Sequence, residues 1–384
     1  MNWDFLIKDK DAITVTTDSR KITPGCVFVA LKGEHFDGND YVEQAEKDGA
    51  IYIIKGVNAL AELQDLARAW RRKWGKTVLA ITGTNGKTTT KELTAAVLKT
   101  KYNVLYTQGN YNNSLGVPLT VLQLTAAHDL AIVEMGASHP GDIKELVDIA
   151  EPNLGLITNV GRAHLQGFGS FEGVMATKAE LYDYLAAHNG IVFQNADNPY
   201  LKQMLPAGCK TIRYAGSPML SGTHLVGDYN AENIRAALCV GEYFGVSQAD
   251  GEAAIRAYIP SNNRSQAMKT EHNDLVIDAY NANPTSMQAA INAFKGNAYI
   301  LGSMRELGEY TKLEHQNIAN MLLERKADLV YLVGKEWQET TAPYPVYETV
   351  EDLASWLQVH PIQDKHILIK GSRSNQLEKI IPLL

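Results

Sequence analysis

The chain lacks the features that would place it in a membrane or in an oxidising compartment. No apolar run approaches the roughly 20 residues needed to span a bilayer. The N-terminus, MNWDFLIKDKD, has acids where a signal peptide carries basic residues. The three cysteines, Cys26, Cys209 and Cys239, are scattered and show no metal-ligand spacing. These absences predict a cytoplasmic protein with reduced, structural thiols and no membrane insertion.

An excess of basic charge is also missing. The formal charge of −7 argues against a dedicated nucleic-acid binder. A basic and aromatic cluster, WRRKW at residues 70–74, is expected to be a solvated helix end before the next strand. The length of 384 residues exceeds one ordinary core and predicts two or three domains.

Strand candidates alternate with helical stretches through three regions. Residues 1–76 are expected to form a small α/β unit around CVFVAL and AIYIIKG. In residues 77–260, the strands VLAIT, DLAIVEMG, LGLITNVG and GIVFQN predict a mainly parallel sheet covered on both faces. Residues 261–384 repeat the pattern through DLVIDAY, NAYILGSM, ADLVYLVG and KHILIKGSR. The predicted fold class is therefore α/β with three domains.

A glycine-rich turn joins the first strand of the central region to a helix, in VLAITGTNGKTTTKEL. Gly83 and Gly86 permit backbone conformations that a Cβ would forbid, and the amides of the turn and helix start can point at an anion. Lys87 supplies a point charge and Thr88 a hydroxyl for Mg²⁺. The strict phosphate-loop pattern is not met, because Ile81 stands where its first glycine belongs. The tighter GTNGKT form still predicts a nucleotide-phosphate site, since a turn that merely starts a helix needs neither the lysine nor the threonines.

Three further residues can be placed relative to this turn. Glu134 ends the apolar run DLAIVEMG, where a carboxylate can reach a Mg²⁺ bound beside the first loop. His164 follows another strand, and a structural histidine and a site histidine are equally compatible with that place. From spacing alone, Lys178 is expected to be a solvated helix lysine.

Polar residues recur after later strands. Asn230 and Asn233 near a helix start could read a purine edge or cap the helix, and the sequence decides for neither. The segment DAYNANPTSM places an acid and asparagines before a helix that begins with proline, which suits a small polar ligand. Arginines in GSMRELGE and IKGSRSNQ suit a carboxylate or phosphate, although loop charges are usually solvated.

Taken together, the segments GTNGKTT, VEMGAS, NVGRAHL, TKAEL, DYNAENIRAAL, DAYNANPTSM, GSMRELGE and KGSR resemble, in order and spacing, the Mur ligase family of peptidoglycan synthesis. The stretch TDSRKITPGCVFVALKGEHFDGNDYV is similar to that family's UDP-binding N-terminal domain. The resemblance implies a small α/β UDP-binding domain, a central P-loop ATPase-like domain with a mainly parallel sheet, and a C-terminal Rossmann-like α/β domain.

The resemblance also implies a reaction. The DAYNANPTSM segment looks most like family members that add D-alanyl-D-alanine to a UDP-N-acetylmuramoyl tripeptide with ATP and Mg²⁺, two ions being expected. A peptide carboxylate would attack the γ-phosphate to give an acyl phosphate, which the dipeptide's amine would then attack. The partners implied are these small molecules, with no nucleic acid, and a monomer is expected.

The family's nucleotide and metal residues carry over by similarity. The resemblance assigns Thr88 and Glu134 to one Mg²⁺ and His164 to a second. Lys178 matches a lysine that is carbamylated in several members, which would turn a repelling cation into an anion at the metal site. Lys87, His164 and Lys178 are thus implied in catalysis. The implied nucleotide contacts are Gly83, Thr84, Asn85, Gly86, Lys87, Thr88 and Thr89 at the phosphates, Asn233 at adenine, Arg264 at a phosphate, and Asp278 at the ribose.

The substrate residues carry over in the same way. Those implied for the uridine diphosphate are Ser19, Arg20, Asp37 and Gly38. Those implied for the muramoyl peptide are Asn110, Asn112 and Asn113, and those for the dipeptide are Asn281, Asn283, Ser286 and Arg373. Asn39, Tyr229 and Ser114 depart from the family's usual residues, which leaves the detail of the nearby ligand contacts open.

Other functions fit the sequence less well. A sister ligase that adds a diamino acid, or a folylpolyglutamate-type synthetase, is disfavoured by the DAYNANPTSM loop and by the absence of a DNPR-type motif. A non-catalytic scaffold with the same fold would be expected to have lost at least one of the reactive residues, all of which are present. A generic GTPase or kinase would leave the C-terminal motifs unexplained, and no NKxD motif appears.

We expect Lys87→Ala to abolish ATP turnover while leaving the fold intact, because the lysine's charge is needed at the phosphates and not in a core. Phosphate release measures the first effect, and thermal unfolding the second. Turnover at the wild-type rate would contradict the phosphate-loop assignment.

Overall fold

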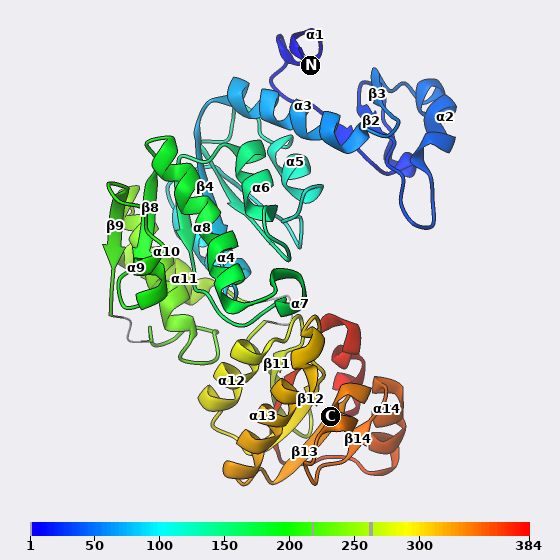
Figure 1. Cartoon of the computed structure of the whole chain (residues 1–384), viewed down its shortest axis with the longest axis vertical. Coiled ribbons are helices and arrows are strands. Elements are labelled where there is room, and N and C mark those ends of the chain that lie inside the picture. Colours follow the sequence, from blue (N-terminus) through cyan, green and yellow to red (C-terminus); the bar gives the residue numbers. More distant parts are fainter. Residues whose placement is uncertain (1, 217–218, 261–263) are drawn as a thin grey trace.

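The computed structural model describes residues 2–216, 219–260 and 264–384 and contains three sheets that follow one another along the chain (Figure 1). The first has three strands, and the second and third have six strands each. All strand pairs are parallel except β10 with β11, so the predicted α/β class with mainly parallel sheets is confirmed.

The N-terminal sheet is small and has the order β1-β2-β3. Its elements are α1 (Asp4–Ile7), β1 (Val15–Thr16), the 3-10 turn η1 (Ser19–Lys21), β2 (Val27–Val29), η2 (Gly38–Tyr41), α2 (Val42–Lys47) and β3 (Tyr52–Ile54). Helix α3 (Ala59–Trp74) leads from this sheet to the central one (Figure 1).

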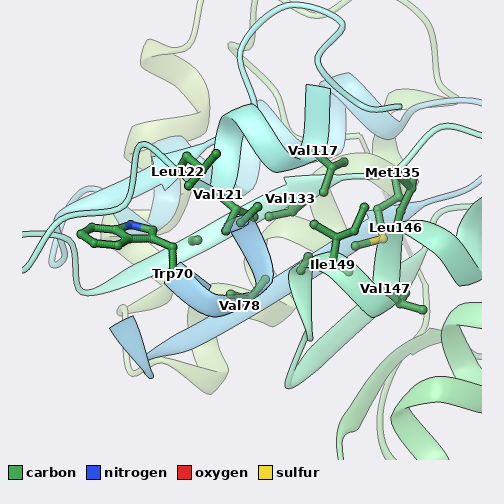
Figure 2. Close-up of a cluster of buried hydrophobic side chains, with 14 of the residues drawn as sticks. Trp70, Val78, Val117, Val121, Leu122, Val133, Met135, Leu146, Val147 and Ile149 are labelled. Carbon is green, nitrogen blue, oxygen red and sulfur yellow. The ribbon is translucent and has the colours of Figure 1, made fainter. Parts of the chain in front are cut away.

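Helix α3 buries one apolar face against the central domain. Leu63, Leu66, Ala67 and Trp70 recur at the helical period and are buried, and the helix ends at Gly75 in the left-handed conformation. Figure 2 shows Trp70 at one end of the resulting cluster, with Val121 of α5 near it and Leu146 and Val147 of α6 toward the other end.

The expectation of a solvated helix end at residues 70–74 is wrong for its first two residues. Trp70 donates its indole N–H to Leu124 O at 2.9 Å, and Arg71 donates Nε to Ala150 O at 2.9 Å. Both side chains are buried because the helix end packs on the loops of the next domain, whereas Arg72 remains exposed.

The central sheet has the order β5-β6-β4-β7-β8-β9. Its strands are β4 (Thr77–Thr82), β5 (Val104–Tyr106), β6 (Leu130–Glu134), β7 (Leu154–Ile157), β8 (Ile191–Asn195) and β9 (Lys210–Tyr214). Its helices are α4 (Lys87–Leu98), α5 (Gly116–Val121), α6 (Asp142–Ala150), α7 (Leu165–Phe168), α8 (Phe171–Ala187), α9 (Pro199–Gln203), α10 (Asn230–Tyr243) and α11 (Gln248–Ala257).

Side chains alternate across this sheet with the two-residue strand period. Val78 and Ala80 face the cluster formed with α3, α5, α6 and α8. Leu79 and Ile81 face the opposite cluster, formed with α4, α10 and α11. Both faces are therefore covered, as predicted.

The C-terminal sheet has the order β10-β11-β15-β12-β13-β14. Its strands are β10 (Gln266–Lys269), β11 (Asp274–Asp278), β12 (Ala298–Gly302), β13 (Leu329–Val333), β14 (Val346–Tyr347) and β15 (His366–Lys370). Its helices are α12 (Pro284–Ala293), α13 (Thr311–Glu324) and α14 (Val350–Val359), with the 3-10 turns η3 (Gly308–Tyr310), η4 (Lys335–Glu339), η5 (Arg373–Asn375) and η6 (Leu377–Leu383). Buried clusters lie on both faces, one with α12 and α13 and the other with α14.

Within the described ranges, no helix is long and apolar enough to cross a membrane. Cys26, Cys209 and Cys239 are free thiols, and Cys26 and Cys239 are buried.

Candidate functional site

The turn between β4 and α4 takes a backbone shape that only glycine adopts without strain. Gly83 has φ of 140° and Gly86 has φ of 78°. A Cβ on Gly83 would lie 2.0 Å from Thr158 Oγ1, and one on Gly86 would lie 2.4 Å from Asn233 Oδ1. The turn thus needs both glycines for its conformation and for the close approach of its neighbours.

A second strand end holds this turn in place. Asn159, after β7, accepts from Asn85 N at 3.0 Å through its side chain and from Thr84 N at 2.9 Å through its carbonyl. Thr158 Oγ1 donates to Asn85 O at 2.6 Å. Sequence reasoning missed Asn159, although it lies near the end of the predicted strand LGLITNVG.

Lys87 begins α4 and folds back over the turn. Its Nζ donates to Gly83 O at 2.8 Å and to Thr84 O at 3.0 Å. Loss of hydration lowers the pKa of Lys87 to about 8, with Arg264 adding to the decrease and Glu134 opposing it. An anion bound at the turn would favour the charged form and raise this pKa again.

Glu134 at the end of β6 is a buried carboxylate next to Thr88. Its Oε1 accepts from Thr88 Oγ1 at 3.2 Å and from Asn112 Nδ2 at 2.8 Å. Its Oε2 is buried without a hydrogen bond and lies 3.8 Å from Lys91 Nζ.

This arrangement suits a Mg²⁺ ion that binds together with a nucleotide better than it suits a metal ion coordinated only by protein side chains. Mg²⁺ typically takes one or two carboxylates and completes its shell with waters and substrate phosphates. In the described part of the chain, no group of three or more His, Cys, Asp or Glu side chains could hold a metal. The orphaned oxygen of Glu134 and the Thr88 hydroxyl therefore suit an ion that arrives with a nucleotide.

His164 lies at the start of α7 in the left-handed conformation, with φ of 51°. Its Nδ1 is hydrogen-bonded to the carboxylate of Glu306, which comes from the C-terminal domain. That bond holds the pKa of Glu306 below its usual value. Glu306 belongs to the GSMRELGE segment, but sequence reasoning did not select it as His164's partner.

Lys178 is buried in α8 at 2% exposure, so the spacing-based expectation of a solvated helix lysine is wrong. Its Nζ lies 5.5 Å from the centre of the Phe168 ring. Burial, followed by the charge of Lys87, lowers the pKa of Lys178 to about 7. The residue does not line the cavity described below, although the charge of Lys87 in the phosphate turn contributes to its lowered pKa.

The two asparagines of α10 are buried, and they do not cap the helix. Tyr229 is the N-cap residue and makes no side-chain capping bond. Asn233 accepts from Thr90 Oγ1 at 3.0 Å and donates to Asn230 Oδ1 at 2.9 Å, while Asn230 donates to Val226 O at 2.8 Å. The capping alternative is therefore wrong. Asn233 instead ties α10 to α4, and Asn230 ties α10 to the segment before it.

Arg264 and Asp278 approach from the C-terminal side. The Arg264 guanidinium carbon lies 4.0 Å from the centre of the Tyr280 ring, and Arg264 Nε is buried without a hydrogen bond. Asp278 ends β11 and forms an ion pair with Lys370 at 2.6 Å. Sequence reasoning missed Tyr280 and Lys370, because neither stands out without its neighbour.

A cavity of about 980 Å³ lies between the central and C-terminal domains and collects most of the predicted residues. Those that line it are Thr84, Asn85, Gly86, Lys87, Thr88, Thr89, Asn110, Asn112, Asn113, Glu134, His164, Asn233, Arg264, Asp278, Asn281, Ser286 and Arg373. Gly83 and Asn283 lie behind this lining, and Asn283 Nδ2 donates to Asn85 Oδ1 at 2.8 Å across the two domains.

The four residues expected at a uridine diphosphate do not line the cavity. Arg20 is 86% exposed in its side chain and pairs with Asp18, while Ser19 begins the same turn. Asp37 accepts from Asn39 N at 3.0 Å at the start of η2. A Cβ on Gly38 would lie 2.7 Å from Leu31 O, so this glycine permits close packing.

The loops around the cavity are held by hydrogen bonds of asparagine side chains. Asn113 Oδ1 accepts from Leu115 N and from Gly116 N, at 3.2 and 2.8 Å, before α5. Asn283 and Ser286 form a reciprocal capping box at the start of α12. These bonds fix the backbone of both loops, and Asn281 and Arg373 remain on the cavity wall.

Comparisons with known proteins agree with this arrangement. Three family models match, described as Mur ligase family, catalytic domain (residues 13–98), Mur ligase middle domain (81–218) and Mur ligase, glutamate ligase domain (263–377).

Similar proteins span nearly the whole chain. The UDP-N-acetylmuramoyl-tripeptide–D-alanyl-D-alanine ligase of Bacillus subtilis (strain 168) is 32% identical, over 96% of this chain and 92% of the relative. The enzyme of the same name from Escherichia coli (strain K12) is 33% identical, over 96% of this chain and 93% of the relative. The crystal structure of MurF ligase from Thermotoga maritima in complex with ADP has a TM-score of 0.86 at 29% identity, and the match covers 98% of each chain.

We expect Tyr280→Ala to raise the KM for ATP roughly three- to thirtyfold. The substitution removes the cation–π contact with Arg264, and the free energy of such a contact corresponds to about this change in affinity. The matched control is Tyr280→Phe, which keeps the ring under Arg264 and should retain a KM near that of the wild type. Initial rates of phosphate release at varied ATP measure both. Equal KM values in all three proteins would contradict a role for the stacked pair.

Proposed function

The chain belongs to the Mur ligase family, and we infer that it is the ATP-dependent ligase that adds D-alanyl-D-alanine to UDP-N-acetylmuramoyl tripeptide. The products are the UDP-N-acetylmuramoyl pentapeptide, ADP and phosphate, and the reaction belongs to peptidoglycan precursor synthesis. The observation that carries this function is the similarity to two such ligases over 96% of the chain.

The first chemical step makes an acyl phosphate. A carboxylate oxygen of the tripeptide attacks the γ-phosphorus of ATP, the bond to the β-γ bridging oxygen breaks, and ADP leaves. In our proposal, Lys87 and the turn amides hold the β- and γ-phosphates, with Arg264 on the opposite wall. Mg²⁺, held by Thr88 and Glu134, would neutralise charge on the phosphate oxygens.

The second step makes the peptide bond. The dipeptide amine attacks the acyl carbon, a tetrahedral intermediate forms, and inorganic phosphate leaves with its bonding electron pair while the amine loses a proton. We propose that Asn281, Asn283, Ser286 and Arg373 hold the dipeptide and that Asn110, Asn112 and Asn113 face the muramoyl peptide. The location of both loops on one cavity with the phosphate turn supports this, since it brings the reactants into one enclosed space.

Several finer assignments complete the proposal. Ser19, Arg20, Asp37 and Gly38 would hold the uridine diphosphate, and His164 would serve a second Mg²⁺. Domain boundaries near residues 76 and 260 are proposed to separate the UDP-binding, ATP-binding and ligase domains. We also propose a monomer acting in the cytoplasm.

Lys178 is proposed to act as a carbamate. A lysine pKa of about 7 leaves much of the amine neutral near pH 7, and only the neutral amine attacks CO₂. The nitrogen bonds to the carbon of CO₂ and releases a proton, which leaves an anion where a cation would repel Lys87. The buried side chain and its depressed pKa support this modification.

We predict that phosphate release from ATP requires both the UDP-N-acetylmuramoyl tripeptide and D-alanyl-D-alanine. The assay compares the dipeptide with single amino acids, glutamate and a diamino acid as the added amine. Release with a different amine would move the chain to a sister ligase. Release with none of these amines would favour a non-catalytic scaffold.

We predict that Lys178→Ala strongly lowers activity and that short-chain carboxylic acids partly restore it, because they can occupy the place of the carbamate. Depletion of CO₂ should lower wild-type activity, and bicarbonate should restore it. Lys202→Ala is the control, since that lysine is exposed on α9 and should behave as the wild type. Full activity of Lys178→Ala without rescue would remove Lys178 from the mechanism.

A further inference from the structure

Lys370 is a buried lysine at the wall of the cavity that none of the reaction steps uses. It ends β15, is 1% exposed, and lines the cavity beside Asp278. Its Nζ donates to Asp278 Oδ2 at 2.6 Å and to the Asn281 carbonyl at 3.1 Å. One ammonium group thus contacts both the acid at the end of β11 and the loop that follows it.

The sheet itself creates this contact. Strands β11 and β15 are parallel neighbours, and Asp278 and Lys370 are partners in their register. Both residues are the last of their strands, so their side chains meet at the carboxyl edge, where ligands bind in such sheets.

The cost of burying the Lys370 charge indicates that its ion pair with Asp278 has a role other than stabilising the fold. Removing an ammonium from water costs several kcal/mol, and a buried ion pair often stabilises a protein no better than well-packed apolar side chains would. Asp278 is less buried than its partner, at 16% side-chain exposure, and lies on the cavity wall. Lys370 engages one of its two carboxylate oxygens, Oδ2.

We propose that Lys370 is a positioning residue for recognition of the nucleotide ribose. It holds the Asp278 carboxylate in the orientation that accepts a hydrogen bond from a ribose hydroxyl. Through the Asn281 carbonyl, it also fixes the start of the loop proposed for the dipeptide. This inference rests on the proposed function, because it takes ATP as the substrate.

The experiment compares ATP with 2′-deoxyATP and 3′-deoxyATP as the varied nucleotide, with tripeptide and dipeptide saturating. A hydrogen bond from a hydroxyl to a carboxylate should make kcat/KM for ATP at least about tenfold higher than for one of the analogues. In Asp278→Asn and Lys370→Met, kcat/KM for ATP should exceed that for the same analogue by no more than about threefold. The double variant should show no further loss, because both changes remove the same interaction.

Matched controls separate positioning from folding. Lys365 lies just before β15, and its Nζ forms an exposed ion pair with Asp328 at 2.8 Å. Lys365→Met should therefore leave the ratio of kcat/KM values unchanged. Thermal unfolding reports stability independently, and the double variant should be more stable than Lys370→Met because no unpaired buried charge remains. If Lys370→Met does not fold, the ratio of kcat/KM values is measured in the double variant and in Lys370→Gln, which retains a donor group.

Two results would overturn the inference. One is a Lys370→Met enzyme that keeps the wild-type preference for ATP while Asp278→Asn loses it, because the lysine would then serve stability alone. The other is a wild-type enzyme that does not distinguish ATP from either analogue. Wild-type release that depends on tripeptide and dipeptide would leave the proposed function intact in both cases.

Discussion

The backbone of the turn between β4 and α4 is the constraint on which the rest of the site depends. Its amides can converge on an anion only if residues 83 and 86 adopt positive φ, which leaves no room for side chains there. Neighbouring segments then bond to the turn directly, through Asn159 from the central sheet and Asn283 from the C-terminal domain. A change in this turn would therefore disturb both walls of the cavity.

Charge is balanced around the cavity by ion pairs that involve buried lysines. Glu134 is buried and lies 3.8 Å from Lys91, which is itself fully buried and donates to Thr107 O. Asp278 pairs with Lys370 on the opposite wall. Such contacts orient the carboxylates before any ligand arrives, so little reorganisation is needed when phosphates and metal bind.

The two large domains meet through polar contacts and through Tyr310, which packs against the apolar cluster around Phe168, in addition to the cavity that both line. Arg162 donates to the buried carboxylate of Glu314 at 3.0 Å, and its backbone amide donates to Thr285 Oγ1 at 3.0 Å. Interfaces between domains of one chain commonly permit relative motion of the domains. Closure of the site can then accompany binding, which would exclude water from the acyl phosphate.

The sequence by itself determined the α/β class, the central strands of the two large sheets and the phosphate turn, because each has a local signal of apolar runs or glycine spacing. It did not reveal β1, β5, β9, β10 and β14, which all lie at sheet edges, where short or polar strands suffice. Only the tertiary structure buried Lys178, paired His164 with Glu306 and set Lys370 beside Asp278. Those outcomes depend on residues far apart in the chain, and the dielectric and partners that a side chain meets exist only once the chain has folded.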